Sequence, residues 1–217
     1  MDSIIQTLAI AALPVIFAIT LHEAAHGYAA RHFGDLTAWQ AGRISLNPIR
    51  HVDPVGTVIV PAMILLLSAG NFLFGWAKPV PVDFGRLRNP KQDMFWVAAA
   101  GPGVNLAMAL GWAALLKLAG TLPDNAYSLP LARMADIGVD VNLVLMCLNL
   151  LPIPPLDGGR IAVSLLPHRL AWKFARIEPW GFPILLVLLF TGILGAMLGP
   201  VIGMVRFLIA AIFRFHY

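Results

Sequence analysis

Long apolar runs constrain the fold of this chain more than any other feature of its sequence. The first run, residues 4–30, would form a helix of roughly 40 Å, which exceeds the ~30 Å thickness of a hydrocarbon core. Further apolar runs occupy residues 55–75, 94–118, 135–151 and 182–213. Because helices satisfy their backbone polar groups internally, we predict an all-α polytopic membrane protein, a helix bundle of about four to six transmembrane segments.

The composition excludes several classes of protein. Hydrophobic residues make up 59% of the chain and charged residues 12%, whereas a soluble domain carries about 25% charged residues. We therefore exclude a soluble enzyme, a disordered chain and a nucleic-acid binder, and attribute the net charge of +4 to basic loops flanking a membrane. The single cysteine, Cys147, excludes an internal disulfide framework and a multi-cysteine zinc cluster. Any metal must be bound by His, Asp or Glu.

The strongest chemical signal is the segment His22-Glu23-Ala24-Ala25-His26, inside the first apolar run. Ionisable groups are costly at membrane depth, which favours a functional role. Positions i and i+4 of a helix share one face, so His22 and His26 can hold one metal ion while Glu23 reaches its bound water. The alternative is a pair of packed histidines beside a hydrogen-bonded glutamate.

A catalytic zinc site usually takes three protein ligands, so a third ligand is required. The candidates in polar surroundings near an apolar run are His51, Asp53, Asp83 and Asp157. Asp157 is favoured because three prolines precede it and two glycines follow it, and irregular backbone at membrane depth is tolerated only against protein or a wet cavity. The alternative for Asp157 is the N-cap of a helix that follows a loop.

Three motifs in this order resemble the site-2 protease family of intramembrane zinc metalloproteases: HEAAH at 22–26, GPGVN at 101–105 and NLLPIPPLDGG at 149–159. The resemblance covers most of the chain. Residues 46–56 and 75–82 are similar to segments of small, compact members of that family. No stretch of these residues could form the PDZ or CBS domain of larger members, and we expect a single intramembrane protease domain over residues 1–217.

The resemblance implies a role for each motif residue. It implies that one zinc ion is bound by His22, His26 and Asp157, and that Glu23 is the catalytic acid and base. It implies that Asn149 contacts the backbone of the substrate. For Asn105, in the GPGVN motif, substrate binding and plain helix packing are equally weighted interpretations.

The order of the motifs restricts the topology. HEAAH lies near the C-terminal end of one helix and Asp157 just past the C-terminal end of another, so a shared site requires the two helices to be parallel. Parallel helices need an odd number of crossings between them, and the sequence offers two runs, 55–75 and 94–118. We predict that residues 55–75 re-enter instead of crossing, because Pro61 interrupts them and residues 68–71 suit a turn.

The basic residues support this re-entrant arrangement. It places residues 31–54, 76–93 and 152–181 on one side of the membrane, where they contribute eleven Lys and Arg residues against Arg133 alone on the other side. Because short cytoplasmic loops collect Lys and Arg, we expect the site near the cytoplasmic face and the N-terminus outside. The sequence does not decide the structure of the run at 182–213, where Gly199-Pro200 either kinks one helix or turns a hairpin.

The function expected from these features is that of a zinc-dependent intramembrane endopeptidase, a multi-pass protein of a prokaryotic cell membrane. Its expected partners are the lipid bilayer and transmembrane protein substrates, with no nucleic acid. Residues 41–46 and 80–84 have partial strand character, and a small membrane-associated β element there could pair with unwound substrate. Two alternatives are a transporter or metal-handling protein that binds a passing cation, and a membrane metalloprotease that cleaves aqueous substrates with a glutamate as third ligand.

Overall fold

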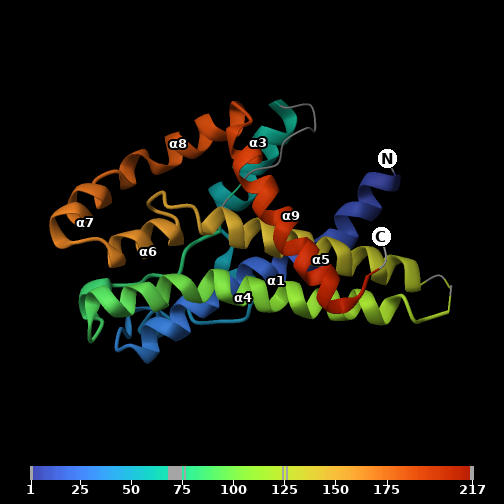
Figure 1. Cartoon of the computed structure of the whole chain (residues 1–217), viewed down its shortest axis with the longest axis horizontal. Helices are drawn as coiled ribbons and strands as arrows, with labels where there is room; N and C mark the ends of the chain where they lie inside the picture. The colour runs from blue at the N-terminus through green and yellow to red at the C-terminus, as the bar shows by residue number, and fades with distance from the viewer. Residues whose placement is uncertain (1, 68–74, 76, 124, 126, 216–217) are drawn as a thin grey trace.

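Helices account for every regular element in the part of the chain that the computed structural model describes, residues 2–67, 75, 77–123, 125 and 127–215 (Figure 1). The helices, with the short 3-10 turns η1 and η3 and the π-helical segment η2, are α1 (Asp2–His32), α2 (Thr37–Gln40), η1 (Pro48–His51), η2 (Pro54–Ile59), α3 (Val60–Leu67), η3 (Phe84–Arg86), α4 (Pro90–Ala119), α5 (Ser128–Asn149), α6 (Asp157–Leu165), α7 (His168–Ala175), α8 (Glu178–Phe190) and α9 (Ile193–Phe213). The predicted all-α fold is confirmed.

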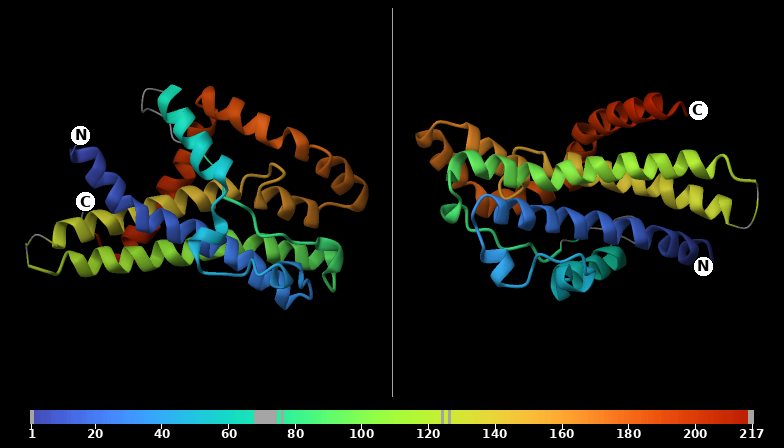
Figure 2. Two further views of the ribbon diagram at one scale, coloured as in Figure 1. Left: turned by 180° about the vertical axis from the view of Figure 1, so that it is seen from behind. Right: turned by 90° about the horizontal axis from the view of Figure 1, so that it is seen from below.

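Three long helices, α1, α4 and α5, lie side by side along the molecule (Figure 1, Figure 2). Asn105 of α4 donates to the carbonyl of Ala18 on α1, while His26, two turns further along α1, contacts the carbonyl of Val97, two turns earlier on α4. Asn105 also donates to Asn142 of α5, and an added Cβ at Gly138, one turn earlier on α5, would meet the ring of Trp112, two turns later on α4. Helix α4 therefore runs opposite to α1 and α5, and those two helices are parallel, as the motif order predicts.

In the described part of the chain, three helices are long and apolar enough to cross a membrane: Ala9–His32, Pro90–Ala119 and Ile193–Phe213. Helix α5 has a similar length but carries Asp136 and Asp140 in its middle. Both acids pair with Arg206 of α9, Asp136 at 2.7 Å, so the arginine of the last apolar run has two counter-charges on a neighbouring helix. Such pairing reduces the cost of ionised side chains at membrane depth.

Residues 55–75 do not carry the chain to the other side of the bundle. The chain enters η2 after His51, and the N–H of Lys78 donates to the carbonyl of His51 at 2.9 Å, so the segment returns to where it started. This hydrogen bond brings the two ends of the segment together, as the re-entrant prediction requires, and entry of the segment into a membrane stays a prediction. Pro61 lies at the first turn of α3, where a proline is tolerated, and the turn expected at residues 68–71 lies outside the described residues.

Two expectations about secondary structure are wrong. No β-strand forms in the described residues, segments 41–46 and 80–84 included. Arg43 of the first segment instead donates side-chain hydrogen bonds to the carbonyls of Lys78 and Pro79, which lie just before the second segment. Prolines 79 and 81 have no N–H to donate to a ladder. The last apolar run breaks at Gly192, whose φ of +76° is left-handed, and not at Gly199-Pro200, which lies inside the continuous helix α9. The structure thus has two helices, α8 and α9, where the sequence left a kink or a hairpin open.

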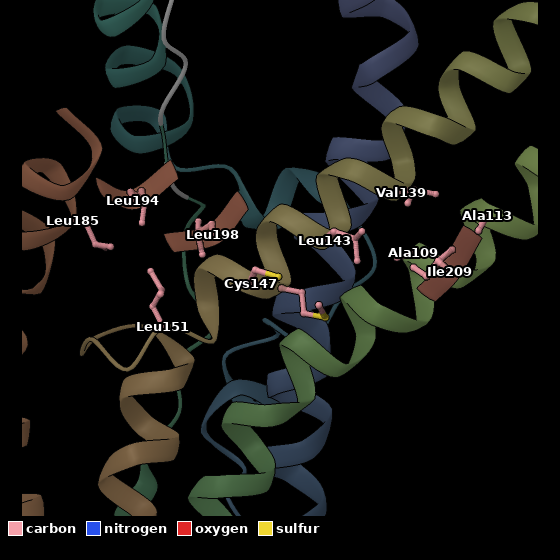
Figure 3. Close-up of a cluster of buried hydrophobic side chains, with 11 residues drawn as sticks. Ala109, Ala113, Val139, Leu143, Cys147, Leu151, Leu185, Leu194, Leu198 and Ile209 are labelled. Atoms are coloured by element: carbon pink, nitrogen blue, oxygen red, sulfur yellow. The ribbon is translucent and has the colours of Figure 1, made fainter. Parts of the chain in front are cut away.

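A cluster of buried apolar side chains joins the C-terminal helices to α4 and α5 (Figure 3). Leu143 of α5 has no exposed surface and lies among side chains of α4 and α9. Cys147 is buried in the same cluster as a free thiol. Because lipid is as apolar as leucine, this cluster stabilises the bundle through close packing and not through removal of apolar surface from water.

Candidate metal centre

Three predicted ligands from distant parts of the sequence meet in one place. His22 and His26 project from one face of α1, and Asp157 is the first residue of α6. The two Nε2 atoms lie 3.1 Å apart, and the Asp157 carboxylate oxygens lie 3.2 Å from His22 Nε2 and 3.3 Å from His26 Nε2. The three side chains are 9, 11 and 15% exposed. They form a largely buried cluster of metal-binding atoms.

The spacing of these atoms fits a zinc ion. Zinc binds imidazole nitrogen and carboxylate oxygen at about 2.0–2.2 Å in a tetrahedron, whose corners then lie roughly 3.3 Å apart. The measured separations match this edge length. In addition, Asp157 Oδ2 is buried and receives no hydrogen bond from the described residues. A buried oxygen without a donor is costly, and a cation at the centre of the three side chains would satisfy it.

Each imidazole is oriented by an acceptor behind it. His22 Nδ1 contacts Asn105 Oδ1 at 2.6 Å, and His26 Nδ1 contacts the carbonyl oxygen of Val97 at 2.8 Å. Because both partners are acceptors, each Nδ1 carries the proton and each Nε2 keeps the lone pair that a metal needs. The proton positions are inferred from these acceptors.

The amide of Asn105 is held in turn by its own acceptors. Its Nδ2 donates to the carbonyl of Ala18 at 3.2 Å and to Asn142 Oδ1 at 2.9 Å, and Asn142 Nδ2 donates to the carbonyl of Gly138 at 2.8 Å. Asn105 and Asn142 have no exposed surface. Asn105 therefore lies behind His22, a contact that the sequence did not reveal, and its binding of substrate stays a prediction.

Helix α4 approaches the two histidines closely because Gly101 lacks a side chain. A Cβ at this position would lie 2.5 Å from His22 Cε1 and 2.5 Å from His26 Nε2. Two residues later, a Cβ at Gly103 would meet nothing within 4 Å. The GPGVN motif therefore supplies both the glycine that admits the imidazoles and the asparagine that orients one of them. The sequence indicated close helix packing here but not that the metal ligands were the neighbours.

The chain reaches Asp157 through a turn that folds back on itself. A Cβ at Gly158 would lie 2.2 Å from the carbonyl oxygen of Leu150, and a Cβ at Gly159 would lie 2.4 Å from the nitrogen of Pro154. Only glycine fits so close to backbone atoms. The two glycines and the prolines before them therefore end α5, reverse the chain and start α6 with the carboxylate facing α1.

Glu23 and Asn149 are the predicted catalytic and substrate-binding residues. Glu23 is half-buried, and its Oε2 accepts a hydrogen bond from the N–H of Val80 at 2.8 Å. Asn149 is the last residue of α5 and half-buried, and its Nδ2 donates to the carbonyl of Leu145 in the same helix. The role of Asn149 stays a prediction.

The other candidate ligands are engaged elsewhere. The Nε2 atom of His51 contacts the carbonyl of Ser45 at 2.8 Å. Asp53 accepts backbone hydrogen bonds at the start of η2, and Asp83 does so at the start of η3. In the described residues, the cluster at His22 is the only group of three such side chains that converges on a metal-sized space.

Comparison with known proteins points to the same chemistry. The chain is 40% identical over 194 residues to "Putative zinc metalloprotease YwhC" of Bacillus subtilis. The aligned region covers 88% of this chain and 84% of that relative. It is 32% identical over 177 residues to "Putative zinc metalloprotease Rip2" of Mycolicibacterium smegmatis, covering 81% of this chain and 64% of that relative. The Rip2 protein of Mycobacterium tuberculosis is 33% identical over 153 residues, 70% of this chain and 54% of that relative. No family model and no solved structure matches the chain.

Proposed function

Because this chain belongs to the site-2 protease family of zinc metalloproteases, we propose that it hydrolyses peptide bonds within or near the transmembrane segments of other membrane proteins. Its relatives support a metalloprotease, and the depth of the site supports cleavage inside the membrane. His22 and His26 lie within Ala9–His32, a helix long and apolar enough to cross a bilayer. This position is the observation that carries the proposal.

The residues at the site suit peptide hydrolysis. His22, His26 and Asp157 would hold zinc, which supplies a Lewis acid and lowers the pKa of a water molecule to about 7 when bound. Glu23, next to His22 on α1, is the carboxylate that would take the proton of the attacking water and return it to the leaving amine. The reaction needs no covalent intermediate with the protein.

The substrate proposed here is a membrane-spanning helix. Such a helix hides its amide groups in internal hydrogen bonds, so it must unwind before a carboxylate or a water molecule can reach the scissile bond. The eleven basic residues on the side of α1 where His26 lies support a site near the cytoplasmic face of a multi-pass protein in a prokaryotic cell membrane. The lipid bilayer is then a second partner.

Cleavage by purified Glu23→Gln tests this function. The variant should keep its zinc and lose cleavage of a single-span substrate by roughly a hundredfold or more, since acid and base catalysis contributes about 10²–10⁴-fold. A cation carrier would behave differently: neither wild type nor variant would cleave, and the variant would lose ion affinity. Equal cleavage by both proteins would contradict the proposed role of Glu23.

A further inference from the structure

A short backbone segment, residues 78–81, passes directly over the proposed catalytic carboxylate. It is called the 78–81 strap here. Two of its four residues are prolines at 79 and 81, so only Lys78 and Val80 carry an N–H. The N–H of Lys78 donates to the carbonyl of His51 at 2.9 Å. The N–H of Val80 is therefore the one backbone donor that the strap can direct toward α1, and it donates to Glu23 Oε2 at 2.8 Å.

The strap is fixed on both sides of this hydrogen bond. Arg43 donates to the carbonyl of Lys78 at 2.9 Å and to that of Pro79 at 3.3 Å. On the other side, the Val80 side chain is 7% exposed and packs over Gly27, where an added Cβ would lie 3.2 Å from Val80 Cγ1. Gly27 follows Glu23 by four residues and so lies on the same face of α1.

We propose that the backbone N–H of Val80 positions the Glu23 carboxylate for acid and base catalysis. A hydrogen bond to Oε2 restricts rotation of the carboxylate, and Oε1 is left to exchange protons with water. The prolines contribute by fixing φ at about −65°, which keeps the strap extended without competing donors. Val80 is a positioning residue that acts through its main-chain N–H, and its buried side chain helps to hold the strap in place. This inference rests on the proposed peptidase function.

The first test measures the contact itself, without activity. Amide hydrogen exchange of the zinc-loaded protein reports on Val80 alone within residues 79–81, because prolines have no amide hydrogen. Glu23→Ala should speed exchange at Val80 by roughly tenfold or more, while the amide of Lys78, which is bonded to His51, stays protected. Unchanged exchange at Val80 would overturn the proposal.

The second test removes the donor with little change to the backbone. Val80 already precedes a proline and is therefore biased toward the extended region that proline itself adopts. Val80→Pro should lower kcat by roughly tenfold to a hundredfold, the loss expected for a hydrogen bond to a charged group, with KM and zinc content unchanged. Val80→Ala keeps the N–H, so its kcat should fall far less than that of Val80→Pro.

Val82→Pro is the matched control, because it places proline two residues further along and the N–H of Val82 has no hydrogen-bond partner among the described contacts. It should cleave at close to the wild-type rate. A Val80→Pro protein with wild-type kcat would overturn this inference alone, and so would one that loses zinc, since the strap would then hold the site together instead of orienting Glu23. A wild type without Glu23-dependent cleavage would overturn the proposed function and this inference with it.

Discussion

At the residue scale, the metal ligands depend on groups that have no exposed surface of their own. Asn105 accepts from His22 and donates to two oxygens, so all of its contacts are made inside the bundle. The carbonyl of Val97 holds His26 in the same way. These partners select the imidazole tautomer with a free lone pair at Nε2, which is the form that binds zinc.

Replacing Asn105 by leucine should weaken zinc binding. Leucine has a similar volume but cannot accept from His22 Nδ1, and it leaves Asn142 Oδ1 without its donor. Loss of a partner that orients a ligand typically lowers metal affinity by about 10–100-fold, measurable by competition with a chelator. Asn149→Leu is the control, since the Asn149 side chain donates to a carbonyl of its own helix α5 and its loss should leave zinc affinity unchanged. Wild-type affinity in Asn105→Leu would contradict this role.

Two glycines of one motif should respond differently to alanine. Gly101→Ala would place a methyl group 2.5 Å from ring atoms of both histidines, so we expect loss of stoichiometric zinc. Gly103→Ala meets open space, and alanine favours a helix by about 1 kcal/mol over glycine, so zinc should stay and the thermal midpoint should rise slightly. Metal analysis and thermal unfolding of both proteins in detergent check this. Full zinc occupancy in Gly101→Ala would show that α4 can move away.

The candidate ligands could be predicted from local sequence patterns together with the family resemblance. Four residues separate His22 from His26 on one helix, and Asp157 follows an unusual run of prolines. The contacts of Asn142 and Val97 could not be predicted, because they depend on the axial register of α4 against α1 and α5. No local pattern encodes that register.

At the element scale, the prediction that rested on the number of crossings agrees with the structure, and two that rested on local propensity are wrong. The parity of the crossings required that one of the runs 55–75 and 94–118 does not cross, and Pro61 with the turn residues at 68–71 selected 55–75. The hydrogen bond between Lys78 and His51 brings the two ends of that segment together. Strand propensity misled at residues 80–84, where proline removes the donors that a sheet needs. Pro200 also misled, because apolar helices tolerate an internal proline.

The junction between α1 and η3 makes stability depend on pH through Asp35. Burial raises the pKa of this carboxyl, but hydrogen bonds from Thr37 and from the backbone of Thr37 and Asp83, with the nearby charge of Arg86, outweigh burial and leave its pKa below the ordinary value. A pKa that is lowered in the folded state contributes stability above the unfolded pKa of about 3.9, and that stability is lost as the pH falls further.

Asp35→Asn should therefore destabilise the protein at pH 7 by about 1.5–3 kcal/mol, the value of hydrogen bonds to a charged group. The difference from wild type should shrink as the pH falls below about 4, because the wild-type carboxyl then takes up its proton. Unfolding in detergent at pH 7, 5 and 3.5 measures this. A difference in stability that stays constant over this range would contradict a charged Asp35.

At the scale of the whole molecule, the parallel helices α1 and α5, with the antiparallel helix α4 packed against both, bring the candidate zinc ligands to the same level of the bundle. The opposite ends of the bundle are distinct: the N-terminus lies at one end, and α7 lies with the start of α4 at the other (Figure 1). Lys91 of α4 donates to the carbonyl of Leu166, which ties these two segments together. The candidate metal centre lies inside the bundle, and the orientation of this end toward the cytoplasm stays a prediction.

Zinc content of purified Asp157→Ala tests the central claim most directly, because Asp157 is the candidate ligand that comes from the distant turn and meets both histidines of α1. Wild type should bind one zinc ion per chain, and Asp157→Ala should retain little of it after dialysis against a weak chelator. Asp53→Ala is the matched control, an aspartate that caps η2 and should keep its zinc. One full equivalent of zinc in Asp157→Ala would contradict a centre built from His22, His26 and Asp157.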